Sequence, residues 1–424
     1  MEKLLHYVWK HKIFPLQPLR TTAGQRVEVI DPGLPNRNAG PDFFNAKLKI
    51  DGTLWAGNVE IHALASDWFR HGHSADKAYD SVILHVVGED DGEVLRADGS
   101  VMPQLVLTCP DEVRARYDEL LAFDKRPPCQ QILPALSKLT VHAWFSALQA
   151  ERLEQKTEAI THRLSLCNQD WEAAFFVTLA RNFGFGLNGD VFEAWALRVP
   201  LRAVDKHRDQ LFQVEAIFFG QAGLLDEALD DAYYRQLQHE YRYLQHKFEL
   251  PAPLPVEQWR MLRLRPYNFP YLRLAQLASL YQQRPSLFSQ LMEAETPEAA
   301  KKLLTVVPSV YWEEHYSFHK VSTRSRKQVG QGTLDLLLIN TVVPFLYAYG
   351  RHKMNETLCN RALYFLETLK AEHNHITRFW ENSGLPVPLA TAADSQALIQ
   401  LQKEYCDKKE CLRCRFGYEY LKGH

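Results

Sequence analysis

The sequence predicts an α+β fold in two parts, a small α/β domain over residues 1–125 and a large all-helical region over residues 130–424. Two patterns support this division. Between residues 26 and 87, short runs of alternating apolar and polar residues are separated by turn residues, as in β-strands. From Ser137 onward, apolar residues recur at helical spacing, with Gly and Pro mostly between the segments.

The N-terminal part predicts the order helix, strand, strand, strand, helix, strand. Its hairpin turns at Asp51-Gly52, a dipeptide that favours the left-handed conformations of a tight two-residue turn. The expected elements are an amphipathic helix over 1–14, a strand over 26–30, a hairpin of 43–50 with a run from Thr53, a helix from Ser66, a buried strand over 81–87 and a further hairpin over 96–108 turning at Asp98-Gly99.

The rest of the chain predicts helices without a fixed repeat, so it does not predict a solenoid. The expected helices span 137–163, 169–182, 200–222, 226–247, 271–282, 286–293, 297–304, 332–349, 353–371 and 392–404.

Composition is that of an ordinary globular protein, with 46% hydrophobic and 24% charged residues. The net charge of −2 gives no overall basic field, so any nucleic-acid surface has to be local. The N-terminus lacks a signal-peptide pattern, and Thr333–Tyr349 is too short and interrupted to span a bilayer. Seven cysteines in a chain of this length do not predict a disulfide scaffold. We expect a cytoplasmic protein with reduced thiols and no membrane association.

Two acids and a histidine form the most informative pattern. Asp42 precedes the first strand of the hairpin, and Glu60 and His62 lie two residues apart on the second. Alternate residues of a strand share one face, and hairpin pairing brings Asp42 near that face. Metal-dependent phosphodiester hydrolysis commonly uses carboxylates that bind a divalent cation, with a basic group beside them. His62 at neutral pH suits activation of water or metal ligation.

The element order, Pro41-Asp42 and Glu60-Ile61-His62 resemble the PD-(D/E)XK nuclease superfamily. The resemblance implies a restriction-endonuclease-like domain, a mixed sheet with flanking helices, in a hydrolase that acts on DNA or RNA. It implies that Asp42 and Glu60 bind Mg²⁺ or Mn²⁺, and that His62 stands where most members carry a lysine. Glu2 matches an acidic residue that some members place on the first helix.

Most of the chain also resembles an uncharacterised bacterial family, a domain of unknown function. The phrases that carry this resemblance are GPDFFNAKL from Gly40, GNVEIHALASDW from Gly57, HGHSADKAYDSVILHVV from His71 and ARNFGFGLN from Ala180. This resemblance implies relatives without implying a mechanism.

A histidine-rich stretch supports an alternative. Histidine and carboxylate together suit zinc, manganese or iron better than magnesium. The stretch therefore also predicts a metallohydrolase of another substrate class, or a set of side chains that supports the Asp42/Glu60 centre. Its members fall within 24 residues and are His62, Asp67, His71, His73, Asp76 and His85.

Three cysteines near the C-terminus have the spacing of metal ligands, Cys406-x4-Cys411-x2-Cys414. They predict zinc or an iron–sulfur cluster, and a four-ligand site needs one more residue. Cys129, at the junction of the two parts, is the first candidate, followed by His373 or His375. Some nucleases of the resembled superfamily hold an iron–sulfur cluster with a similar layout of cysteines.

Arginines interleaved with aromatic residues predict nucleic-acid contact in the helical region, since guanidinium groups bind phosphates and rings stack on bases. The candidates are Arg181, Arg260, Arg263, Arg265 and Arg273. Arginine–aromatic pairs also join helices, so a packing role stays open. A third hypothesis is a non-catalytic scaffold for nucleic acid or protein on a degenerate nuclease fold. The sequence identifies no protein partner.

Overall fold

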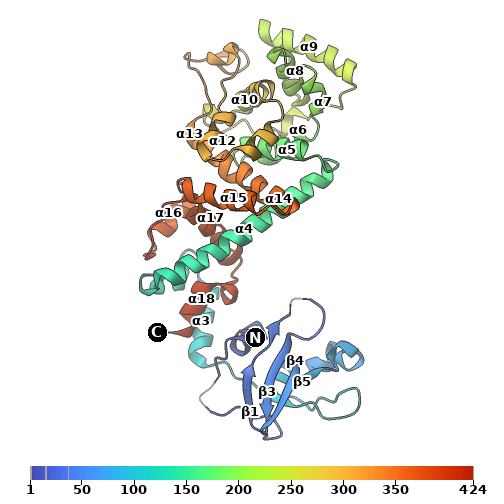
Figure 1. Ribbon diagram of the computed structural model, residues 1–424, viewed down its shortest axis with the longest axis vertical. Coiled ribbons are helices and arrows are strands. Elements are labelled where there is room, and N and C mark those ends of the chain that lie inside the picture. Colours follow the sequence, from blue (N-terminus) through green and yellow to red (C-terminus); the bar gives the residue numbers. More distant parts are fainter. Residues whose placement is uncertain (1, 15–16, 37, 424) are drawn as a thin grey trace. The chain divides into compact units, whose positions relative to one another are not determined.

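The computed structural model describes residues 2–14, 17–36 and 38–423, and the chain forms two compact units (Figure 1). The first unit comprises Met1–Leu136 and Lys403–His424, and the second Ser137–Gln402. Helices make up 55% of the chain and a mixed sheet lies in the N-terminal region, so the mixed class is confirmed. The sequence predicted a division at 125–130, whereas the units divide after Leu136, and residues 403–424 also belong to the first unit.

A mixed sheet is the framework of the first unit, with strand order β1-β3-β4-β5-β6 and β2 paired to β3 (Figure 1). Its strands are β1 (Val27–Asp31), β2 (Leu34–Pro35), β3 (Phe43–Ile50), β4 (Thr53–Leu64), β5 (Val82–Glu89) and β6 (Gln104–Val106). Strands β1, β3 and β4 pair antiparallel, whereas β5 runs parallel to β4 and β6 parallel to β5.

The predicted β3–β4 hairpin is confirmed. Ile50 pairs with Thr53, and Asp51 and Gly52 both have positive φ, 46° and 80°, as the tight turn requires. Strand β5 is buried from Val82 to Val87 because neighbouring strands flank both its edges. The further hairpin over 96–108 is wrong, because β6 pairs in parallel with β5, and the predicted turn closes only an isolated bridge between Leu95 and Val101.

Helix α1 (Glu2–Lys10) packs on β4 with Leu4, Leu5, Val8 and Trp9 buried, as its amphipathic pattern predicts. Met1, the first residue of the predicted helix, lies outside the described residues. The other helices of the first unit are α2 (Asp67–Arg70), α3 (Asp111–Ala122), α18 (Arg415–Lys422) and the short 3₁₀ helices η1 (His73–Ala75), η2 (Lys77–Tyr79), η3 (Pro128–Ala135) and η9 (Cys411–Arg413). The sequence missed α3 and α18, which pack against each other (Figure 1).

The second unit is almost wholly helical. Its α-helices are α4 (Lys138–Leu166), α5 (Trp171–Phe183), α6 (Gly189–Ala196), α7 (Leu201–Asp205), α8 (Leu211–Gln221), α9 (Ala232–Phe248), α10 (Pro270–Gln283), α11 (Leu287–Glu293), α12 (Pro297–Leu304), α13 (Gln331–Leu337), α14 (Val343–His352), α15 (Glu356–Thr368), α16 (His375–Glu381) and α17 (Ala392–Gln400). Short 3₁₀ segments η4 (Val256–Gln258), η5 (Pro266–Asn268) and η6 (Val310–Glu313), the π-helical η7 (Leu338–Val342) and η8 (Leu401–Cys406), and the strands β7 (His315–Ser317) and β8 (Lys320–Val321) complete the described elements.

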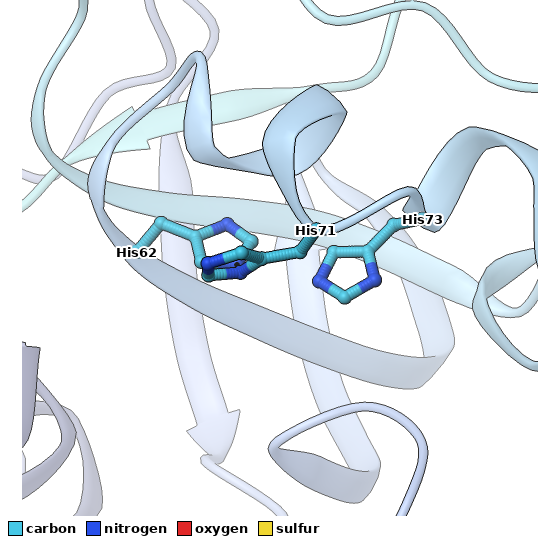
Figure 2. A group of neighbouring side chains, drawn as sticks. All are labelled: His62, His71 and His73. Atoms are coloured by element: carbon cyan, nitrogen blue, oxygen red, sulfur yellow. Dashed lines mark hydrogen bonds between the residues drawn. The ribbon is translucent and has the colours of Figure 1, made fainter.

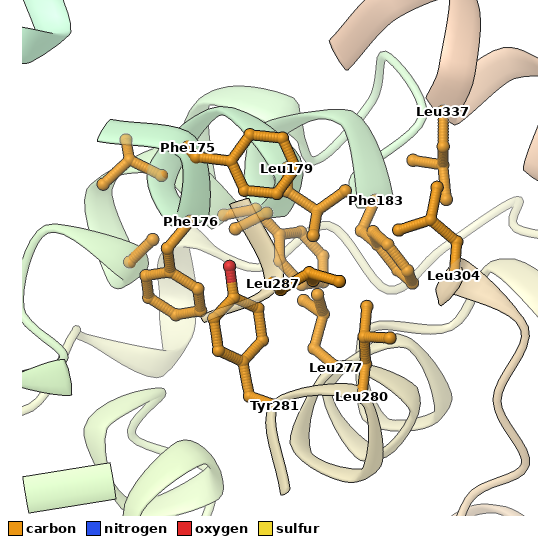
Figure 3. Packing of buried hydrophobic residues seen from close by; sticks show 14 of the residues in the cluster. Phe175, Phe176, Leu179, Phe183, Leu277, Leu280, Tyr281, Leu287, Leu304 and Leu337 are labelled. Atoms are coloured by element: carbon orange, nitrogen blue, oxygen red, sulfur yellow. The ribbon is translucent and has the colours of Figure 1, made fainter. Parts of the chain in front are cut away.

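The core of the second unit is apolar and rich in aromatic residues (Figure 3). Phe176 of α5 meets Tyr281 of α10 edge to face, with ring centroids 4.8 Å apart. The predicted helix over 200–222 is two helices, α7 and α8, because residues 206–210 leave helical geometry. The sequence also missed α6 and α16.

In the described part of the chain, one helical stretch, Gln331–His352, is long and apolar enough to cross a membrane, with a mean hydropathy of 1.3 in its most apolar window. Of that window, 61% is buried inside the protein. The expectation that this stretch is too short to span a bilayer is therefore wrong on length, whereas the helix predicted over 332–349 is confirmed within a longer one.

Candidate functional site

A β-bulge sets Asp42 against Glu60. The register between β3 and β4 shifts between Phe43 and Ala46, where Asn45 has a φ of 56° and its N–H donates to Asn58 Oδ1 at 3.1 Å. The N–H of Asp42 donates to Glu60 Oε2 at 3.0 Å, and the N–H of Ile61 donates to Asp42 Oδ2 at 2.9 Å. Each carboxylate is therefore held by the backbone beside the other.

Strand alternation brings Glu60 and His62 to one face of β4, as the sequence predicted. His62 Nε2 lies 3.5 Å from Glu60 Oε1. On the other side of the ring, His62 Nδ1 lies 2.8 Å from Nε2 of His85, which belongs to the parallel strand β5. His62 and His85 are 2% and 0% exposed, so this pair forms the buried floor of the site.

The connection after β4 adds His71 and His73 (Figure 2). Gly72 between them has a φ of 75°, and this left-handed turn lets both rings approach one centre. His71 Nδ1 lies 3.2 Å from His62 Nε2, and His73 Nε2 lies 3.2 Å from Glu60 Oε1. The ring of His73 also stacks on Tyr79, with centroids 3.8 Å apart.

These side chains fit one transition-metal cation. Nitrogen atoms of His62, His71 and His73 all lie within 4.8 Å of one another. Two ligands at 2.0–2.1 Å from zinc in a tetrahedral site are about 3.4 Å apart. The separations of 3.2 Å between His62 and His71, 3.5 Å between His62 and Glu60, and 3.2 Å between His73 and Glu60 approach that value. The sequence analysis assigned His62 to catalysis, and it left His71 and His73 either as supporting residues or as ligands of an alternative metallohydrolase site.

The electrostatics of the site favour a cation. Burial, then the neighbouring Asp42, raises the pKa of Glu60 to about 8. Burial, followed by the other histidines, lowers the pKa of His62 to about 3, and burial also lowers the pKa of His73. Neutral imidazoles are the form that binds metal. Among the described residues, the ion-pair partners of Asp42 and Glu60 are all histidines.

Among the described residues of the site, three imidazole nitrogens are buried without a hydrogen bond: His6 Nε2, His73 Nε2 and His85 Nδ1. His6 Nε2 lies 3.4 Å from Asp42 Oδ2 and His73 Nε2 lies 3.2 Å from Glu60 Oε1, yet neither contact has hydrogen-bond geometry. Buried polar atoms are rarely left unpaired. Nitrogen and oxygen atoms that face each other in this way are the donor set that a divalent cation completes, so the residues present fit a metal.

A cleft opens beside Asp42. It has a volume of about 580 Å³, and its wall includes Asp42, His6 and a set of cations. On α1, Lys3, His6 and Lys10 lie on one face because they are three and four residues apart. The remaining cations of the wall are Lys408, Lys409 and Arg413, and Glu410 adds one acid.

Sequence reasoning missed His6 and the cleft. The available signal was the spacing of Glu2, His6 and Lys10 on one amphipathic helix. Glu2 Oε1 lies 4.0 Å from His6 Nε2, and the charge of Glu2 contributes to the raised pKa of Asp42, whose first cause is burial. Glu2 therefore lies at the edge of the carboxylate pair.

Two predicted supporting acids have structural partners instead. Asp67 is 2% exposed, pairs with Arg70 at 2.5 Å and accepts the N–H of Leu64 at 3.3 Å. Asp76 accepts the N–H of Ala78 at 2.9 Å and so caps η2. Both shape the segment that carries His71 and His73.

Of the five arginines predicted to contact nucleic acid, two bind side chains of the protein itself and three are exposed. Arg181 pairs with Asp190 and Glu193, both at 2.5 Å, and Arg273 is 3% exposed, bonded to Gln276 and Asn268. Arg181 and Arg273 thus connect elements within the helical unit, which agrees with the alternative that these arginines serve packing. Arg260, Arg263 and Arg265 are exposed on the loop before α10.

The predicted cysteine set lies within the first unit. Cys129, Cys406, Cys411 and Cys414 are all buried. The alternative fourth ligands, His373 and His375, belong to the second unit.

The family model described as "Protein of unknown function (DUF2851)" matches residues 2–375, so the chain belongs to that family. No curated protein and no solved structure matches the chain.

Proposed function

We propose that this member of the DUF2851 family is a metal-dependent hydrolase of nucleic-acid phosphodiesters, with a restriction-endonuclease-like first unit. One observation carries the proposal: the Glu60 carboxylate contacts His62 and His73 on one side and the Asp42 backbone on the other, and Asp42 opens onto a cleft with five cationic side chains. The element order from α1 to β5 supports the same fold.

Glu60, His62, His71 and His73 would hold the cation. Three imidazoles with carboxylate favour manganese or zinc over magnesium. A cation bound here would neutralise charge on the phosphate and lower the pKa of an attacking water.

The second layer of residues fixes the ligand histidine in one tautomer. For His62 Nε2 to ligate, its Nδ1 must carry the proton and donate to His85 Nε2, 2.8 Å away. The proton of His85 is then on its buried Nδ1. His85 is thus a positioning residue for His62.

His6 and Asp42 are suited to moving the proton. They line the cleft, with His6 Nε2 3.4 Å from Asp42 Oδ2, whereas His62 lies below it with 2% exposure. The N–H of Ile61 fixes the Asp42 carboxylate. His6 Nε2 would accept a proton from water or return one to the leaving oxygen, in place of the role that the sequence assigned to His62.

The cationic wall supports a polyanionic substrate. Lys3 and Lys10 project from the exposed side of α1, and Lys408, Lys409 and Arg413 line the same cleft. Phosphate contacts of this kind give sequence-independent affinity that weakens with salt.

Hydrolysis of single- and double-stranded DNA and RNA tests the proposal, with the full chain supplied with manganese, zinc or magnesium. We expect cleavage with manganese or zinc, and a loss of at least about a hundredfold in Asp42→Asn and Glu60→Gln. Asp80→Asn, an exposed carboxylate outside the cleft, is the matched control and retains activity. Absence of cleavage with every metal, or full activity in Asp42→Asn, would overturn the proposal.

The cleft has its own test. Lys3→Glu and Lys10→Glu should raise KM for nucleic acid with little change in kcat, because they alter binding before chemistry. Lys47→Glu reverses an exposed charge on β3 outside the cleft and should leave KM unchanged. Equal KM in all three variants would remove the cleft from the substrate path.

The three-histidine group favours a second candidate, a metallohydrolase of another substrate class. Hydrolysis of a small phosphodiester without cleavage of any nucleic acid would select it. Metal-independent binding of nucleic acid without hydrolysis would instead select the non-catalytic scaffold.

A further inference from the structure

Four cysteines from distant parts of the chain lie in the first unit. Cys129 lies in η3, Cys411 in η9, Cys414 directly before α18, and Cys406 ends η8. Helix η3 packs against α18, which brings Cys129 to the C-terminal trio. The four side chains are 6–8% exposed and none forms a disulfide.

Two tight turns hold the C-terminal thiols. The N–H of Lys409 donates to the carbonyl of Cys406, and the N–H of Cys414 donates to the carbonyl of Cys411, both at 3.2 Å. Gly417 of α18 packs directly against the second turn. A Cβ atom at position 417 would lie 2.1 Å from the carbonyl oxygen of Cys411. Only glycine permits this approach, so the position of Cys411 relative to α18 is fixed.

The thiols are close enough to interact electrostatically. Burial first, and then Cys414 and Cys411, raise the pKa of Cys129. Burial first, and then Cys414, Cys129 and Cys411, raise the pKa of Cys406. Cys411 Sγ has a weak hydrogen bond, at 3.9 Å, to the carbonyl of Leu120.

We propose that Cys129, Cys406, Cys411 and Cys414 bind a metal through four thiolates, as a zinc ion or an iron–sulfur cluster. Four buried cysteines in one unit, none of them in a disulfide, are the donor set of such centres. On binding, each thiol releases its proton to solvent and its sulfur forms a bond to the metal.

The metal would fix one wall of the cleft. Lys408 and Lys409 lie between Cys406 and Cys411, and Arg413 lies between Cys411 and Cys414, and all three line the cleft beside Asp42. The centre would therefore anchor residues 403–424 to the first unit and set the spacing of these cations. This inference stands independently of whether the chain hydrolyses anything.

Metal analysis of the full chain, purified without oxygen, tests the proposal. We expect zinc, or iron with acid-labile sulfide, in stoichiometric amount. Cys129→Ser is the decisive variant, because this residue is remote in sequence from the trio, and it should lose most of that metal. Cys167→Ser alters a partly buried cysteine of the second unit and should retain it. His71→Ala should also retain it, which separates the thiolate centre from the histidine site.

Equal metal content in Cys129→Ser and Cys167→Ser would overturn the proposal. If Cys129→Ser does not fold, spectroscopy of the wild type decides. Cobalt exchanged for zinc should give thiolate-to-metal charge-transfer absorption, and an iron–sulfur cluster should give visible absorption that bleaches on reduction. Wild-type protein with neither signal, after supply of zinc, cobalt, or iron with sulfide, has no thiolate centre.

Discussion

The two units bury a carboxylate in opposite surroundings. Glu215 of α8 is fully buried in the helical unit, where the Tyr233 hydroxyl and the Trp312 Nε1–H, at 3.2 Å, both donate to it. Glu60 in the first unit is 5% exposed and receives one backbone N–H. Its other polar neighbours are imidazole nitrogens and a second carboxylate.

The contrast is between Glu215, whose carboxylate oxygens accept hydrogen bonds from neighbouring donors, and Glu60, whose carboxylate has, among the described residues, no cation beside it to balance its charge. Donors that point at Glu215 complete its hydrogen bonding, so its role is to fix the packing of three elements. The groups around Glu60 are imidazole nitrogens and carboxylate oxygens, whose lone pairs can together ligate one cation. Burial alone does not mark a functional carboxylate, whereas the chemistry of its neighbours does.

The largest expected effect follows from the apolar core of the helical unit (Figure 3). Phe176 is 1% exposed and contacts Trp195, Phe218 and Tyr281. Phe176→Ala should lower the free energy of unfolding of this unit by about 3–5 kcal/mol, because it leaves a cavity. Denaturant unfolding measures the loss, with Tyr364→Ala, at a 46% exposed aromatic position, as control. Equal losses would show that aromatic packing does not stabilise this unit.

Glu215 gives the second prediction, a dependence of stability on pH. Burial raises its pKa from 4.5 to about 7. Between these values the folded state keeps a proton that the unfolded state releases, so stability falls as pH rises from 4.5 to 7 and is constant above. The loss is about 3 kcal/mol.

Glu215→Gln tests this dependence because the amide mimics the protonated acid and does not titrate. Relative to wild type, Glu215→Gln should gain about 3 kcal/mol between pH 4.5 and pH 8. Chemical unfolding of both proteins at each pH measures the difference, and other titrating groups cancel. A difference that stays constant with pH would show that Glu215 is charged in the folded protein.

The sequence predicted the parts of the fold that follow from local pattern. The Asp51-Gly52 turn defined the β3–β4 hairpin, and the run from Ser81 to Val87 predicted a strand buried on both faces. Alternation placed Glu60 and His62 together, and the helical spacing located most long helices.

What the sequence did not predict depends on tertiary contacts. The bulge at Asn45 that fixes Asp42 has no local signature, since asparagine takes a positive φ in many turns. Whether His71 and His73 converge on one centre depends on where β4 lies, which the sequence around Gly72 does not show. The basic cleft combines α1 with residues 408–413, which only the fold brings together.

The third prediction concerns His85, whose Nε2 lies 2.8 Å from His62 Nδ1. His85→Leu keeps the buried volume but removes the acceptor for His62 Nδ1–H. Metal affinity should fall about 10–100-fold, or about 1.4–2.7 kcal/mol. Titration with zinc or manganese measures this. His207→Leu changes a buried histidine of the helical unit and should not alter affinity. Unchanged affinity in His85→Leu would mean that His62 is oriented without its help.

The smallest expected effect concerns the cap of α17. Thr391 begins α17 with a capping box: its hydroxyl accepts the N–H of Asp394 at 3.3 Å, and the Asp394 carboxylate accepts the N–H of Thr391 at 2.9 Å. In the first unit, α2 and α3 begin without a side-chain cap.

Thr391→Ala leaves the first N–H groups of α17 without their acceptor and should cost about 1 kcal/mol of unfolding free energy. Thr391→Ser keeps the hydroxyl and should cost almost nothing. Urea unfolding of both variants resolves the difference. A loss of the same size in Thr391→Ser would assign the effect to packing of the methyl group. The capping box would then contribute nothing measurable to the stability of the helical unit.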